Sequence, residues 1–74
     1  MFSISLRNDD DRTRSYSISS LGEAGWEVKL EQEGKLTRHV YYHDWHRVER
    51  MLALFQLEVT NLTEHGWRET PSVP

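Results

Sequence analysis

The feature that most constrains this fold is an apolar stripe in the second half of the chain. Large apolar side chains recur there at steps of three and four residues, at Trp45, Val48, Leu52, Phe55, Val59 and Leu62. Because an α-helix turns through about 100° per residue, this spacing puts all of them on one side of a single long helix. Such a helix must pack against an apolar surface, which the rest of the chain has to supply.

The first half of the chain alternates apolar and polar residues, the pattern of strands with one buried face. We predict four strands, at residues 2–7, 15–19, 26–31 and 36–42. In the last strand Leu36, Val40 and Tyr42 form the inner row, which Arg38 interrupts. The short connections, among them a tight turn at 33–34, favour an antiparallel meander. The predicted fold is therefore α+β, a four-stranded antiparallel meander followed by one long C-terminal helix packed on one sheet face.

Both ends of the helix are marked in the sequence. Asp44 is placed to cap its start, because a carboxylate accepts a hydrogen bond from a free amide of the first turn. Gly66 is placed to end it, with Trp67 in position to contact Leu62. Residues 69–74 contain two prolines and no periodicity, so we expect a flexible tail after a single domain of residues 1–68.

Length and composition exclude several classes of protein. A chain of 74 residues without cysteine holds one small core and has no disulfide, thiolate nucleophile or cysteine-bound metal. The longest apolar run, residues 51–55, is too short to cross a membrane, and no basic segment precedes the first apolar residues. We therefore expect a soluble, cytoplasmic protein with no membrane partner. The net charge of −3 argues against non-specific binding to nucleic acid.

The helix has a second apolar face, which predicts self-association. Four strands form a sheet roughly 19 Å wide, whereas one helix is only about 10–12 Å across and leaves part of the sheet bare. Turned away from the main stripe are Ala53, Leu54 and Leu57, with Met51 at the margin. We expect these residues to form the interface of a homodimer, and another protein is an alternative partner. The competing interpretation is that the first strand or the tail covers Leu54 and Leu57.

A dense polar and aromatic cluster marks the junction of the last strand and the helix. It is our predicted binding surface and comprises Tyr41, His43, Asp44, Trp45, His46 and Arg47. Two histidines and a carboxylate can ligate a divalent metal, so metal-dependent activity at this junction is one alternative. The helix begins between the two histidines, however, and its spacing does not align them. The simpler interpretation is a capping aspartate beside two solvent-facing histidines.

The sheet face opposite the helix suggests a second alternative. Lys29, His39 and Tyr41 share this outer face and can stack on and attract unpaired bases, whereas Glu27 and Glu31 oppose this role. The order of four strands and a helix resembles single-stranded-DNA-binding domains of the Whirly and transcriptional-coactivator type. This resemblance implies nucleic acid as a partner, but it covers element order only and assigns no residues. The competing interpretation is an ordinary solvated sheet face.

The sequence contains no pattern typical of an active site. None of its four glycines lies in a phosphate-binding loop, and no serine has the context of a nucleophile elbow. We therefore predict a small non-enzymatic module without a cofactor, which binds another macromolecule or assembles with itself.

Overall fold

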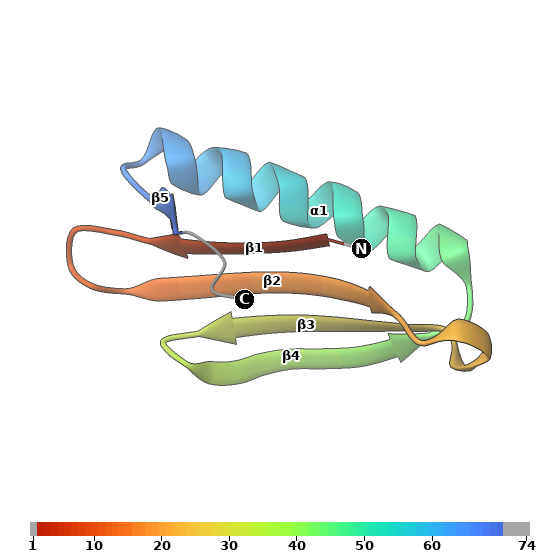
Figure 1. The fold of residues 1–74 in the computed structure, drawn as a ribbon. Helices are drawn as coiled ribbons and strands as arrows, with labels where there is room; N and C mark the ends of the chain where they lie inside the picture. Colours follow the sequence, from red (N-terminus) through yellow and green to blue (C-terminus); the bar gives the residue numbers. More distant parts are fainter. Residues whose placement is uncertain (1, 71–74) are drawn as a thin grey trace.

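The computed structural model describes residues 2–70, which form an antiparallel sheet of five strands with one long helix on one face (Figure 1). Along the chain the elements are β1 (Phe2–Arg7), β2 (Thr13–Ser20), a 3-10 turn (Gly22–Ala24), β3 (Trp26–Gln32), β4 (Lys35–Tyr42), α1 (Trp45–Glu64) and β5 (Arg68–Thr70). Across the sheet the order is β4-β3-β2-β1-β5. The predicted α+β class, the antiparallel meander and the single long helix are confirmed.

The fifth strand is a correction to the predicted topology. β5 pairs with the second half of β1, with Thr70 opposite Ser5 and Arg68 opposite Arg7. The first two residues of the predicted tail, 69 and 70, thus belong to the sheet, and 71–74 lie outside the described residues. A strand of three residues is too short to show a period of two, and it forms because the edge of β1 offers free backbone groups.

The predicted inward orientation of Leu36 is also wrong, because its side chain faces away from the helix. The pairing of β3 with β4 shifts between Leu30 and Glu31, so that Leu30 lies opposite Arg38 but Glu31 lies opposite Leu36. The extra residue on β4, Thr37, reverses the side to which the start of the strand points. Leu36 is therefore half exposed on the outer face, whereas Val40 keeps its predicted inward position.

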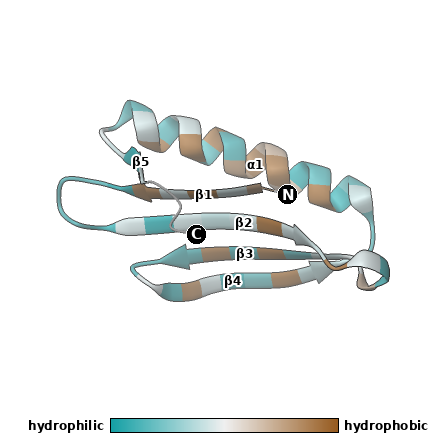
Figure 2. Cartoon of the chain, in the orientation of Figure 1, coloured by the Kyte–Doolittle hydropathy of each residue, from teal (hydrophilic) through white to brown (hydrophobic). Residues whose placement is uncertain are grey.

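The core lies between the helix and the inner sheet face. Figure 2 shows hydrophobic and hydrophilic residues alternating along β3 and β4, as strands with one buried face require. The buried hydrophobic residues are Leu6, Tyr16, Ile18, Val28, Val48, Met51 and Phe55. The aromatic rings of Tyr16 and Phe55 form its centre, with centroids 4.8 Å apart. Of the predicted stripe, Leu52, Val59 and Leu62 are only partly buried.

The helix begins and ends close to the predicted positions. An Asp44 side-chain oxygen accepts a hydrogen bond of 3.0 Å from the His46 amide, which confirms the predicted cap. At the other end the Trp67 amide donates to the Leu62 carbonyl oxygen over 3.0 Å, and both side chains pack against the core. The helix therefore has defined ends, and its N-terminal cap, Asp44, lies within the predicted junction surface.

Candidate functional site

The outer face of the sheet carries a cluster of four polar side chains from β3 and β4. Glu27 lies opposite Tyr41 across the two strands, and Lys29 lies opposite His39 in the next row. Antiparallel partners point to the same face, so this pairing brings the four side chains together. We refer to Glu27, Lys29, His39 and Tyr41 as the Glu27 cluster.

The Glu27 carboxylate forms the centre of this cluster. Its Oε2 lies 2.7 Å from His39 Nε2 and accepts a hydrogen bond of 3.1 Å from the Tyr41 hydroxyl. Because an ionised carboxylate only accepts, the His39 nitrogen is the donor. Lys29 Nζ lies 3.8 Å from the other carboxylate oxygen. One acidic side chain thus holds all three residues that the sequence suggested for nucleic-acid binding.

These contacts change the acid–base properties of the cluster. Two hydrogen bonds lower the pKa of Glu27 below its ordinary value, and the one from His39 has a larger effect than the one from Tyr41. The same carboxylate raises the pKa of the Tyr41 hydroxyl. Glu27 is therefore ionised at neutral pH and offsets the positive charge of Lys29, so the outer face presents no uncompensated basic group at this position.

The rest of the outer face is covered mainly by small hydroxyl side chains. In β1 and β2 these are Ser3, Ser5, Thr13, Ser15, Ser17 and Ser19. Ser5 and Ser15 hydrogen-bond to each other across the two strands, with their Oγ atoms 3.0 Å apart. Such side chains have no large aromatic surface on which bases can stack, and Tyr41 is left as the main exposed ring of this face.

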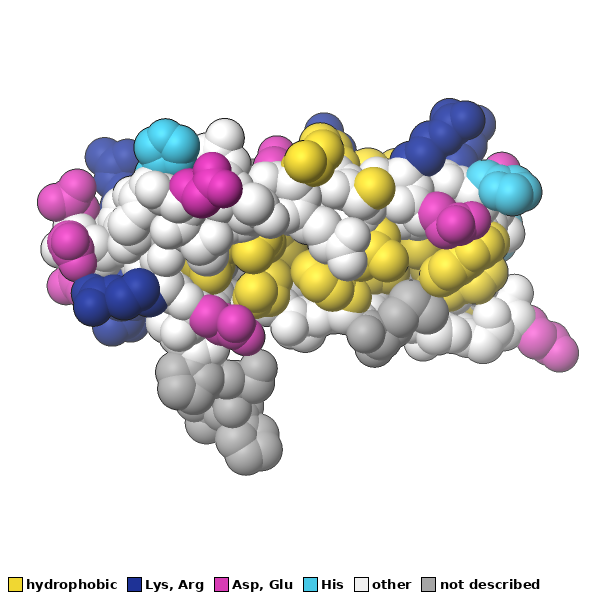
Figure 3. Space-filling model, turned by 90° about the horizontal axis from the view of Figure 1, so that it is seen from above, with side chains coloured by type: hydrophobic (Ala, Val, Ile, Leu, Met, Phe, Trp, Pro, Cys, Tyr) yellow, Lys and Arg dark blue, Asp and Glu magenta, His cyan; other side chains and the backbone are white. Residues whose placement is uncertain are grey.

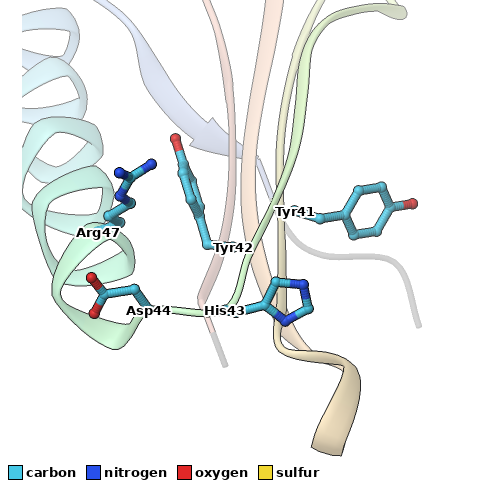
Figure 4. A pocket seen from close by; sticks show the side chains of 5 residues that line it. All are labelled: Tyr41, Tyr42, His43, Asp44 and Arg47. Atoms are coloured by element: carbon cyan, nitrogen blue, oxygen red, sulfur yellow. The ribbon is translucent and has the colours of Figure 1, made fainter.

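The predicted junction surface is divided between the two faces of the sheet. A hollow of about 320 Å³ is lined by Tyr41, Tyr42, His43, Asp44 and Arg47. In Figure 4 the side chains of Tyr42, Asp44 and Arg47 lie on the helix side of β4, whereas Tyr41 points away on the other side. Alternation along the strand imposes this division. Side chains that are neighbours in sequence therefore do not converge on one ligand.

Two further junction residues have separate surroundings. Trp45 packs its ring against Trp26 at the start of β3, with centroids 5.4 Å apart. The His46 side chain is 84% exposed, and its Nδ1 lies 3.6 Å from Glu49 one turn along the helix. Trp45 thus fixes the start of the helix on the sheet, and His46 faces solvent.

The three candidate metal ligands His43, Asp44 and His46 are not brought together. Asp44 is engaged as the helix cap, and His46 is turned toward Glu49. Over residues 2–70 no three His, Asp or Glu side chains are grouped so that they can hold a metal ion. The arrangement of the described residues therefore gives no support to metal-dependent activity at the junction.

The second face of α1 is exposed at three of the four predicted positions. Leu57 is 69% exposed and Leu54 is 42% exposed, and Ala53 is exposed beside them. Met51 instead lies in the core of the protomer, where the Arg38 guanidinium contacts its sulfur at 3.8 Å. Met51 therefore does not belong to the exposed face of α1, contrary to the prediction. The described part of the chain does not cover the two leucines.

The sequence analysis missed a small polar hollow near the end of α1. It has a volume of about 160 Å³ and is lined by Arg14, Glu58, Asn61 and Leu62. The Arg14 guanidinium lies 5.2 Å from the centre of the Trp67 ring, a cation–π contact. The signal that could have revealed it is the position of Arg14 two residues before Tyr16, in the inward-facing row of β2.

Comparisons with known proteins identify no relative of this chain, so the geometry described above is the basis for its proposed function. Scans against family models, curated proteins and solved structures give no match. Within residues 2–70 no helix has the length and apolar character needed to cross a membrane.

Proposed function

We propose that this protein is a homodimeric binding and assembly module, in which two copies associate through the exposed face of α1. The observation that carries the proposal is the exposure of Leu54 and Leu57 beside Ala53, midway along a helix whose other side packs against the core. Exposed leucines that lie one turn apart on a helix are typical of helix–helix contacts.

The size of the protein also favours association. A chain of 74 residues without cysteine has a small core and no disulfides to support it. The inner sheet face is incompletely covered, since Phe2 and Ile4 of β1 are only partly buried. Contact with a second copy adds buried apolar area without a longer chain.

Sedimentation velocity over a range of micromolar concentrations tests this proposal. We expect the wild type to sediment as a dimer and the double variant Leu54→Glu, Leu57→Glu to sediment as a monomer, because the substitutions bury carboxylates in the contact. Leu21→Glu is the matched control, since Leu21 is 40% exposed but lies outside the helix. A monomeric wild type at every concentration would contradict the proposal.

Binding of single-stranded nucleic acid by the outer face is the weaker candidate. Its residues Lys29, His39 and Tyr41 are all held by Glu27, so binding a phosphate backbone would have to displace an internal carboxylate. The experiment is titration of labelled oligonucleotides at two salt concentrations. Salt-dependent binding that is lost in a His39→Ala, Tyr41→Ala variant would restore this candidate.

A further inference from the structure

The exposed side of α1 carries a regular stripe that is longer than its leucine pair. Two of its residues, Arg47 and Asn61, lie at its margin, where they also line the two hollows described above. The residues of the stripe follow one another at steps of three, four, three, four and three, and all of them are exposed. This is the spacing at which one helix forms a continuous seam against another. We refer to Arg47, Arg50, Leu54, Leu57, Asn61 and Glu64 as the pairing stripe.

The chemistry of the pairing stripe is ordered along the helix. Two arginines occupy its N-terminal third, two leucines its middle, and an amide and a carboxylate its C-terminal third. Figure 3 shows a small hydrophobic patch midway along the upper edge of the view, above a longer hydrophobic band, and basic side chains lie to the right of this patch, toward the end where α1 begins. The two ends of the stripe therefore differ in charge, and its centre is apolar.

The positions in the stripe also match one another about a single centre. Leu54 and Leu57 lie equally far from the midpoint between Phe55 and Gln56, and so do Arg50 and Asn61. Arg47 and Glu64 are likewise equidistant from that midpoint. A stripe with this property is complementary to itself when it is turned end to end.

We infer that the two copies pack their α1 helices antiparallel, about a twofold axis that passes between Phe55 and Gln56. Leu54 then packs against the partner's Leu57, and Arg47 lies next to the partner's Glu64. Arg50 lies next to the partner's Asn61, whose side-chain oxygen can accept a hydrogen bond. A twofold axis repeats each contact once, so the leucine pair and the ion pair each occur twice.

Charge favours this orientation over the parallel one. Parallel helices in the same register would place Arg47 and Arg50 against the same arginines of the partner, and like charges repel. The antiparallel arrangement pairs opposite charges at both ends and also opposes the two helix dipoles. Because the apolar centre is short, these end contacts determine the orientation and the register.

The inferred dimer has four layers, sheet, helix, helix and sheet. The helices meet in the middle, since each α1 lies on the inner face of its own sheet (Figure 1). The two outer faces, each with its Glu27 cluster, then point away from one another. This inference rests on the proposed function and specifies the partner and the geometry of the same surface.

Charge reversal tests the register without disturbing the core. Arg47→Glu and Glu64→Arg should each weaken dimerisation about tenfold, because each puts two pairs of like charges at the ends of the contact. The double variant Arg47→Glu, Glu64→Arg should return the dissociation constant close to the wild-type value. Each substitution favours the helix dipole, so loss of folding is not expected.

The matched control for the first reversal is Arg12→Glu, an exposed arginine in the β1–β2 loop. It makes the same change in net charge and should leave the dissociation constant unchanged. If the single reversals weaken the dimer but the double variant does not recover, the antiparallel register is wrong.

Cross-linking provides an independent measure of orientation, because the chain contains no native cysteine. Variants Arg47→Cys and Glu64→Cys are mixed and oxidised, and the disulfide-linked products are identified by mass. We expect the mixed product to dominate, since facing positions of an antiparallel pair approach within disulfide reach.

The possible failures are distinguishable. A wild-type dimer that requires Leu54 and Leu57 but cross-links each cysteine variant to itself would overturn the antiparallel inference and leave the proposed function standing. A wild type that sediments as a monomer at every concentration would overturn both.

Discussion

Gly25 is the one of the four glycines that leaves no room for an added Cβ. It precedes β3 at φ +98°, and a Cβ on it would overlap the carbonyl oxygen of Tyr42. We expect Gly25→Ala to lower the free energy of unfolding by about 2–3 kcal/mol, because strain and overlap combine. Gly22→Ala, also at positive φ but in open space, should cost only about 1 kcal/mol. Urea denaturation measures both, and equal losses would contradict the role of the overlap.

Glu27 makes stability depend on pH in a predictable direction. Its pKa in the folded protein lies below its ordinary value of 4.5, because His39 and Tyr41 donate hydrogen bonds to the ionised form. As the pH falls, the unfolded state therefore takes up a proton at a higher pH than the folded state does. The stabilisation by Glu27 is complete above the ordinary pKa, and it is lost as the pH falls through the lower pKa of the folded protein.

Glu27→Gln should accordingly be less stable than the wild type at neutral pH, and the difference should shrink in acid. The measurement is the free energy of unfolding of both proteins at neutral pH and near pH 3. Glu31→Gln is the control, since Glu31 lies on the same face outside the cluster. A difference between Glu27→Gln and the wild type that does not change with pH would show that the carboxylate charge is not responsible.

At the scale of the elements, the N-terminus of α1 is capped by the side chain of Asp44. Asp44→Ala should lower the free energy of unfolding by about 1 kcal/mol, because the amide of the first turn loses its acceptor. Asp44→Asn keeps the acceptor oxygen and should lose less. Thermal denaturation followed by circular dichroism measures both. An Asp44→Asn variant as unstable as Asp44→Ala would mean that charge, rather than the hydrogen bond, accounts for the cap.

Most elements could be predicted because their patterns are long. The helix of residues 45–64 and the strands of six to eight residues repeat their period often enough to identify them. β5 has three residues, and the reversal of Leu36 follows from one extra residue in β4. Both depend on hydrogen bonds with a neighbouring strand, which a local pattern does not contain.

For the whole molecule, dimerisation should make stability depend on concentration. If the folded protein is a dimer, each tenfold rise in protein concentration adds up to about 1.4 kcal/mol per mole of dimer to the apparent free energy of unfolding. The unfolding midpoint of the wild type should therefore rise with concentration. The midpoint of Leu54→Glu, Leu57→Glu should stay constant, and a constant wild-type midpoint would argue against association.

The candidate sites were less predictable than the fold. The sequence indicated the exposed leucines of α1 correctly, because helical periodicity alone separates the two sides of a helix. It grouped the junction residues as one surface, whereas strand alternation sends Tyr41 and Tyr42 to opposite faces. The arginine of the small hollow was missed because its neighbours, Glu58 and Asn61, come from the other layer.

The sequence by itself determined the fold class, the helix with its cap, and the apolar stripes on both sides of that helix. These properties are local, since they depend on residues within a few turns or along one strand. Only the tertiary structure decided that Met51 lies in the core and that Leu36 faces outward. It also decided that Lys29, His39 and Tyr41 all contact Glu27. The physical reason is that strand register and the position of the helix on the sheet depend on contacts between segments far apart in the chain.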